Sequence, residues 1–185
     1  MVNHFYSSFS SPFDVFSIIW EENDSDLQVQ RIFLTDPEIK SETKTFIAFK
    51  TIESGSSSVI NSLGNKILKF LEGEKIDFDL QLIGFDQCLE IQKKVLLAEY
   101  DIPRGWVSTN KRIADKIGIP KGARAVGNAL ARNPFPIVIP CHRAIKSNGE
   151  LGGFQGGIEM KRALLEMEGI EFSNRGKVIT NKIYY

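Results

Sequence analysis

The stretch Asn133–Arg143, NPFPIVIPCHR, organises the chain, because it places one of only two cysteines beside one of only two histidines. Within it, Ile137–Ile139 is a short apolar run of β-branched residues, which predicts a buried strand. Pro140 cannot donate to a sheet ladder, so we expect the strand to end there. The sequence therefore predicts that Cys141 lies at the end of a buried strand with His142 next to it.

A cysteine beside a histidine has two interpretations. The thiolate is the reactive form of cysteine, and a nearby imidazole is a common means of generating it. A single cysteine is also a common small apolar residue in protein cores. The stretch alone leaves both interpretations of Cys141 open, and the segments on either side decide between them.

Length and composition indicate an ordinary globular protein. The 185 residues suffice for one large domain or two small ones, and a hydrophobic content of 42% is typical of soluble domains. No run of twenty apolar residues occurs, so we expect no membrane span. The first residues lack the pattern of a secretory signal, and two cysteines make no disulfide framework. We therefore expect a cytoplasmic protein, or a nuclear one in a eukaryote.

The net charge is zero but is unevenly distributed. Residues 1–100 hold 9 basic and 16 acidic side chains, a balance of −7, whereas residues 101–185 hold 14 and 7, a balance of +7. Such asymmetry indicates a C-terminal half that binds a polyanion. Neutralisation of the two halves against each other explains it equally well.

The N-terminal part, residues 1–82, is predicted to be a small α/β support domain. We expect strands over residues 13–20, 29–34 and 46–50, since these are β-rich runs bounded by turn residues. Apolar spacing predicts a helix over residues 60–72, interrupted only by Gly64.

The C-terminal part is predicted to be mostly helical. A helix over residues 86–100 would place Cys88 on an apolar stripe, as a structural residue. After a turn at residues 102–105, Ser108 or Thr109 can cap a helix that ends near residue 117. A further helix over residues 121–132 completes a pattern typical of a helix-turn-helix.

The second helix of this pair has an unusual composition, because small residues surround the long cation Arg124. Small side chains allow a backbone to approach another surface closely, and an arginine among them can insert into it. A face that packs against another helix is the alternative interpretation.

The last predicted helix, residues 157–168, follows a glycine-rich segment, residues 151–157, that can fold over a ligand or serve as a flexible connection. Met160, Leu164 and Glu168 share its inner face, so a carboxylate lies at the helix C-terminus, where the dipole disfavours it. A nearby partner explains this position, and His142 is the candidate. A side chain that bends out to water is the other possibility.

Taken together, residues 91–169 resemble the O6-alkylguanine-DNA alkyltransferases, also called methylated-DNA–protein-cysteine methyltransferases. The matching runs occur in the family's order and spacing, and they are IPRG at 102–105, ARAVG at 123–127, NP at 133–134, IPCHR at 139–143, the 152–157 loop and LL leading to EG at 164–169. The resemblance implies an α/β fold with a β-rich N-terminal domain over residues 1–82, a helix-turn-helix domain over residues 87–172 with a buried active-site cysteine, and a tail over residues 173–185.

The same resemblance implies the chemistry. Cys141 would take the alkyl group from the guanine oxygen, irreversibly and once per molecule. His142 would deprotonate Cys141 through a water, and Glu168 would orient His142. The partner would be double-stranded DNA that contains O6-alkylguanine, bound by a monomer without a cofactor.

The resemblance also assigns residues to DNA and base binding. Arg124 would fill the gap left by the flipped nucleotide, as the helix enters the minor groove. Asn133 would be a hinge and Arg143 a structural tie. The further DNA contacts implied are Ala123, Ala125, Gly127 and Thr109. The residues implied to line the base pocket are Asn110, Ala144, Phe154, Gln155 and Gly156.

The chain departs from the family pattern at two pocket positions. Asn110 stands where the family usually has tyrosine, and Gln155 stands where serine or glycine is frequent. Asn110 can form hydrogen bonds but lacks the ring and its reach, so we expect a lower rate or an altered substrate preference. A cysteine-rich zinc site in the N-terminal domain is not expected, because residues 1–87 contain no cysteine.

Two other functions remain to be weighed against alkyl transfer. One is a non-catalytic sensor of alkylated bases with the same fold, which Asn110 favours and Cys141 disfavours. The other is a hydrolase or regulatory DNA-binding protein that uses the same scaffold.

Overall fold

The computed structural model describes residues 3–23 and 26–185, and it divides into two compact units. The N-terminal unit contains the described residues up to Gln87 together with Pro134–Val138. The second unit contains Cys88–Asn133 and Ile139–Tyr185. Within the described residues, no helix has the length and apolar character needed to cross a bilayer.

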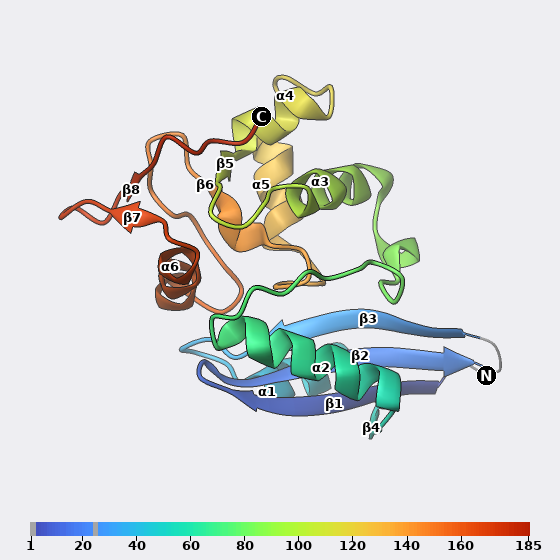
Figure 1. Ribbon diagram of the computed structural model, residues 1–185. Helices are drawn as coiled ribbons and strands as arrows, with labels where there is room; N and C mark the ends of the chain where they lie inside the picture. The colour runs from blue at the N-terminus through green and yellow to red at the C-terminus, as the bar shows by residue number, and fades with distance from the viewer. Residues whose placement is uncertain (1–2, 24–25) are drawn as a thin grey trace. The chain divides into compact units, whose positions relative to one another are not determined.

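The N-terminal unit is a four-stranded sheet with helices against it (Figure 1). The strand order is β3-β2-β1-β4, antiparallel except for the β1–β4 pair. Phe16–Trp20 of β2 is buried at every position, because this inner strand is covered on both faces. The elements are β1 (Asn3–Ser11), β2 (Asp14–Asn23), β3 (Asp26–Leu34), α1 (Ser41–Ala48), β4 (Glu53–Ser54), α2 (Ser58–Leu71) and η1 (Phe85–Gln87).

Helix α2 packs on the sheet through the glycine that interrupts its apolar pattern. A Cβ atom added at Gly64 would lie 2.3 Å from the ring of Phe9 in β1. Phe9 in turn stacks on Phe16, with ring centroids 5.2 Å apart. The glycine is therefore a point of close approach between helix and strand.

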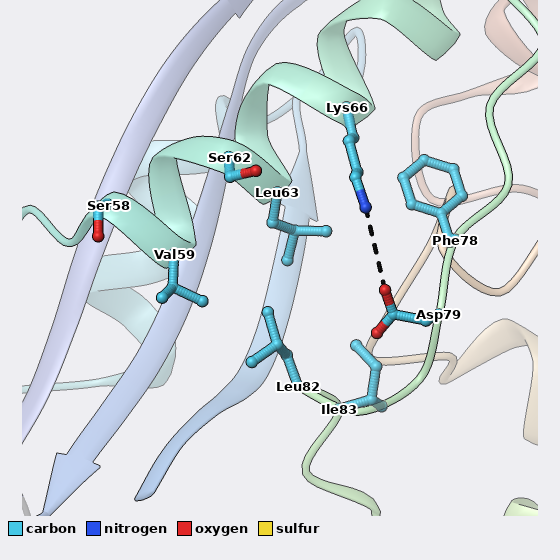
Figure 2. A pocket seen from close by; sticks show the side chains of 9 residues that line it. All are labelled: Ser58, Val59, Ser62, Leu63, Lys66, Phe78, Asp79, Leu82 and Ile83. Carbon is cyan, nitrogen blue, oxygen red and sulfur yellow. Dashed lines mark ion pairs between the residues drawn. The ribbon is translucent and has the colours of Figure 1, made fainter.

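A cavity of about 320 Å³ lies between α2 and the segment that leads out of the N-terminal unit (Figure 2). Its walls are mainly apolar, and its polar rim includes Lys66 and Asp79, whose charged groups are 3.9 Å apart. The lining residues are Ser58, Val59, Ser62, Leu63, Lys66, Phe78, Asp79, Leu82 and Ile83. It contains no cysteine or histidine.

The second unit holds five α- or 3₁₀-helices and short strand pairs in the described chain. The parallel pair of β5 and β6 joins Ser108 to Ala144 and Thr109 to Ile145. Its elements are α3 (Glu90–Tyr100), β5 (Ser108–Thr109), α4 (Asn110–Lys116), α5 (Ala123–Ala131), η2 (Cys141–Arg143), β6 (Ala144–Ile145), α6 (Ile158–Met167), β7 (Glu171–Phe172) and β8 (Val178–Ile179).

Apolar faces of α3, α4 and α5 meet in one core of this unit (Figure 1). Val95, Ile113 and Val126 are fully buried there. A second core lies between β5, β6 and α6 and includes Leu165. Residues beyond 172 join the unit through β8 and through the hydrogen bond from the Tyr184 N–H to the Val107 carbonyl, 2.8 Å long.

Three sequence predictions about secondary structure are wrong. Ile137–Ile139 is buried but forms no strand: Ile137 and Val138 lie in a turn, and Ile137 has a φ of 74°. Prolines at positions 134, 136 and 140 lack an N–H group, so the segment cannot supply a continuous sheet ladder. Cys88 precedes α3 rather than lying on it, and its side chain is half-buried.

The third wrong prediction is a strand over residues 46–50, because residues 46–48 belong to helix α1 and residues 49–50 follow it. The buried face of α1 consists of Ser41 and Thr45, whereas Phe46 and Ile47 are exposed. The Ser17 hydroxyl donates to that of Ser41 over 3.2 Å, so small polar groups make this contact. Apolar periodicity does not predict this helix, because polar residues line its buried side.

The predicted helix over 60–72 and the four predicted helices of the second unit are present, with ends that differ by a few residues. The fold class is therefore as expected, an α/β N-terminal unit and a mostly helical second unit with a helix-turn-helix and a buried cysteine.

Candidate active site

Cys141 opens the 3₁₀ helix η2 and lines a cavity of about 310 Å³ within the second unit. Its N–H donates to the Ile139 carbonyl over 2.8 Å, and the Arg143 N–H donates to the Pro140 carbonyl over 2.8 Å. This tight turn fixes Cys141, a residue that is only 8% exposed, at the wall of the cavity. A reactive group on the wall of a concave pocket reacts with a ligand that enters the pocket.

Four of the five predicted base-pocket residues line this cavity, namely Asn110, Ala144, Phe154 and Gln155. Gly156 is buried and does not line it. The predicted hinge Asn133 also lines the wall, as do Gly127 and Lys161. The cavity thus draws its walls from α4, α5, η2, the glycine-rich segment and α6.

Gly127 and Asn110 touch at the rim formed by α5 and α4. A Cβ atom added at Gly127 would lie 2.9 Å from the Asn110 amide nitrogen. Only glycine leaves room for Asn110 at this point without displacing it. The neighbouring Thr109 caps α4, since its side chain accepts a hydrogen bond from the Arg112 N–H over 3.3 Å.

The carboxylate of Glu168 lies against His142, as the spacing along the last helix predicted. His142 Nε2 and Glu168 Oε1 are 2.9 Å apart, and His142 has no solvent exposure. Arg143 binds the same carboxylate with two nitrogens, Nη2 at 2.8 Å from Oε1 and Nε at 2.9 Å from Oε2. Arg143 also donates to the Ile102 carbonyl over 2.6 Å, which ties the cluster to the turn after α3.

Burial and the neighbouring charges shift the pKa values of Glu168 and His142. Burial alone would raise the pKa of Glu168, but the hydrogen bonds and charges of His142 and Arg143 outweigh it and lower the pKa to about 2. Burial lowers the pKa of His142, and Glu168 opposes that effect. The resting imidazole is therefore neutral at pH 7, in the form able to accept a proton.

Burial raises the pKa of the Cys141 thiol to about 11, while a hydrogen bond from the Asn133 side chain acts in the opposite direction. Asn133 also donates to the Ile139 carbonyl over 3.1 Å. The resting sulfur is therefore a thiol. A proton must leave it before the sulfur can act as a nucleophile.

The helix-turn-helix presents a basic surface next to the cavity. Arg124 and Ala125 are exposed in the first turn of α5, while Ala123 and Gly127 are half-buried. The exposed cations on α4, α5 and their flanks are Lys111, Arg112, Lys116, Lys121, Arg124 and Arg132. Clustered cations around a face of small residues are suited to a phosphate backbone.

Two buried ionisable residues near Cys141 were missed by the sequence analysis. Glu99 of α3 has no exposure, and Lys161 of α6 is 2% exposed. A signal was present for both, because Glu99 lies three and four residues after the apolar Leu96 and Val95, and Lys161 lies seven residues before Glu168. Charged residues at such spacings are usually assigned to the surface, which is why they were passed over.

Comparison with known proteins matches the second unit to one family. Residues 90–170 match the sequence family described as 6-O-methylguanine DNA methyltransferase, DNA binding domain. A methylated-DNA–protein-cysteine methyltransferase of Methanothermobacter thermautotrophicus is 43% identical over 123 residues, which are 66% of this chain and 69% of the relative. The relative from Mycobacterium bovis is 46% identical over a shorter region, and the chain spans 59% of its length.

Solved structures match over most of both units. The crystal structure of the Mycobacterium tuberculosis O6-methylguanine methyltransferase has a TM-score of 0.70 and 32% identity, and the match covers 91% of this chain and 93% of that one. A crystal structure of the M. tuberculosis OGT protein in complex with DNA has a TM-score of 0.68 and 32% identity, covering 88% and 91%. Every residue that lines the cavity of Cys141 lies within the 90–170 region of the family match.

Proposed function

This chain belongs to the family of methylated-DNA–protein-cysteine methyltransferases, which repair DNA by alkyl transfer, and we propose that Cys141 is the residue that accepts the alkyl group from O6-alkylguanine. The observation that carries the proposal is the position of Cys141 on the wall of a cavity, with the next residue, His142, bound to the buried Glu168 at the end of α6. A nucleophile, a base and a group that orients the base are the parts that such chemistry requires.

In the proposed reaction the Cys141 thiol is first deprotonated and then alkylated. His142, acting through a water, takes the proton from the Cys141 thiol, and Glu168 stabilises the imidazolium that forms. The sulfur then forms a bond with the alkyl carbon, while the bond between that carbon and guanine O6 breaks. Guanine keeps the electron pair and regains a proton from His142. The product thioether is stable, so each molecule acts once.

Base flipping supplies the substrate to this cavity. A guanine inside a stacked duplex cannot present its O6 to the thiol of Cys141, a residue that is only 8% exposed, so the nucleotide must leave the stack, at a cost of about a few kcal/mol. We assign Arg124 to the gap that the nucleotide leaves. Ala123, Ala125 and Gly127 allow α5 to approach the DNA closely, and Asn133 links that helix to the active-site turn.

The pocket position Asn110 bears on which adducts are accepted. It lines the cavity and abuts Gly127, and it offers an amide where a tyrosine ring is usual in the family. We propose an altered substrate preference or a lower rate, not a loss of chemistry. Asn110→Tyr should change the relative transfer rates of methyl and larger O6 adducts, measured by competition between two duplexes. Identical relative rates in the variant would remove Asn110 as a determinant of preference.

A non-catalytic sensor of alkylated bases is not favoured, because Cys141 lines the cavity and the buried His142 follows it directly in the chain. We further propose that the protein acts as a monomer and inside the cell, where its DNA substrate is located.

The test uses a duplex that contains one O6-methylguanine. The measured quantity is the number of guanines restored per protein molecule. We expect about one guanine per molecule of the natural protein and none with Cys141→Ala. Cys88→Ala is the matched control, because Cys88 lies outside the cavity, and it should repair as the natural protein does. Full repair by Cys141→Ala would refute the assignment of the nucleophile.

A further inference from the structure

Two side chains that the proposed step does not use lie buried beside Cys141. Glu99 of α3 is completely buried, and Lys161 of α6 is 2% exposed. Side chains of these types are almost never fully buried unless they are paired. Their position next to a nucleophile therefore calls for a physical explanation.

Two backbone carbonyls hold Lys161 at the wall of the active-site cavity. Its Nζ donates to the Ala144 carbonyl over 2.7 Å and to the Gly153 carbonyl over 3.3 Å, and Lys161 lines the same cavity as Cys141. The two carbonyls orient the ammonium but do not neutralise it. A fixed cation at this place stabilises negative charge on the sulfur and then on the departing guanine.

Glu99 of α3 is the acidic side chain that acts electrostatically on this cation, and both residues lie against Ala144. Glu99 faces the Ala144 N–H, yet neither oxygen forms a regular hydrogen bond within the described part of the chain. The cations that act on it are Lys161 and Arg143. Arg143 already binds Glu168 with two nitrogens, so Lys161 is the cation that remains for Glu99.

Resting on the alkyl transfer proposed above, we infer that Glu99 is a positioning residue that keeps Lys161 in its ammonium form beside Cys141. Lys161 retains its proton throughout the reaction. The negative charge that it faces passes from the Cys141 sulfur to guanine as the S–C bond forms and the C–O6 bond breaks. Glu99 contacts neither reacting atom and acts only through Lys161.

The protonation of the pair is consistent with this role. Burial lowers the pKa of Lys161 to about 8, and the negative charges of Cys141 and Glu99 oppose the effect. Burial raises the pKa of Glu99 to about 8, so the carboxylate forms in the range where Lys161 begins to lose its proton. The other titratable or charged groups that act on the pair are Cys141, His142, Arg143 and Tyr185.

Loss of Glu99 should therefore let Lys161 deprotonate at a lower pH. For Glu99→Gln we expect the alkaline limb of the transfer rate to move down by about one pH unit. The rate at about pH 8 should fall roughly fivefold, with little change at about pH 6. The rates are measured in single turnover with the O6-methylguanine duplex in excess, using the full chain.

Two comparisons separate positioning from a merely structural role. Lys161→Met should be slow at every pH, and adding Glu99→Gln to it should have no further effect. Glu90→Gln removes an exposed carboxylate from the first turn of the same helix and should leave the profile unchanged. Glu99→Asp keeps the charge on a shorter side chain and should partly restore the alkaline limb of the transfer rate. This variant provides the test if Glu99→Gln does not fold.

The inference is overturned if the profile of Glu99→Gln superimposes on that of the natural protein, or if the rate falls by one factor at all pH values. Additive losses in the double variant would also overturn it. In each of these cases the natural protein still transfers the methyl group, so the proposed function stands. Absence of transfer by the natural protein at every pH would overturn the proposed function, and this inference with it.

Discussion

At the scale of single residues, the chemistry depends on which charges are paired in the interior. Glu168 could be predicted as a partner of His142, because a carboxylate on the inner face of a helix needs one, and the two groups lie 2.9 Å apart. Glu99 and Lys161 could not be predicted with the same ease. Their neighbours in sequence do not reveal that the chain folds an acid and a base around the same cysteine.

The Glu168 carboxylate should make the stability of the folded protein decrease at low pH. Its pKa is about 2 in the folded protein and near 4.5 unfolded, so its contribution is complete above pH 4.5 and is lost as pH falls toward 2. We expect Glu168→Gln to cost about 3 kcal/mol at neutral pH, because it leaves Arg143 without its carboxylate. The gap to the natural protein should narrow at about pH 3.

Chemical denaturation at the two pH values measures this difference. Glu166→Gln is the matched control, since Glu166 lies in α6, is exposed and forms a surface ion pair with Arg162. A gap for Glu168→Gln that is the same in acid as at neutral pH would show that its charge is not what stabilises the fold.

At the scale of elements, the spacing of apolar residues predicted the helices whose buried faces are apolar. It did not predict a helix with a polar buried face. Helices α2, α3, α4, α5 and α6 were expected, because each places apolar residues toward a core. Helix α1 was missed because its buried face is Ser41 and Thr45. The Ile137–Ile139 run was assigned to a strand because β-branched composition was weighed above the missing N–H groups of its flanking prolines.

Gly64 offers a test of how α2 meets the sheet. Alanine has the higher helix propensity, by about 1 kcal/mol, so an isolated helix would gain from Gly64→Ala. In the protein the new Cβ atom would lie 2.3 Å from the Phe9 ring, and such overpacking costs about 1–3 kcal/mol. We therefore expect a net loss of stability, seen as a lower Tm.

The exposed Asn65→Ala in the same helix is the control and should not lower the Tm. An increase in Tm for Gly64→Ala would mean that α2 can move away from Phe9 without loss, contrary to the close packing described here.

At the scale of the whole molecule, the charge asymmetry assigns DNA binding to the C-terminal half. Residues 101–185 carry a balance of +7, and six exposed cations surround α4 and α5. The asymmetry could be counted from the sequence, but the sequence alone did not distinguish polyanion binding from mutual neutralisation. The M. tuberculosis OGT protein, which is similar to this chain and was solved in complex with DNA, favours the first explanation.

The affinity for duplex DNA should therefore fall steeply with salt. Each phosphate neutralised contributes about −0.9 to the slope of log affinity against log salt, so Lys121→Ala should reduce the slope by about one. Lys69→Ala, an exposed cation of the N-terminal unit, should leave it unchanged. Equal effects of the two substitutions, measured by fluorescence anisotropy, would contradict the assignment of the binding surface.

The most direct test of the central claim is the mass of the intact protein after incubation with a duplex that contains one O6-methylguanine, followed by peptide mapping. The account predicts a gain of one methyl group per molecule, located on Cys141, with no second gain when the DNA is in excess. A methyl group on another residue, or an unchanged protein in the presence of repaired DNA, would contradict it.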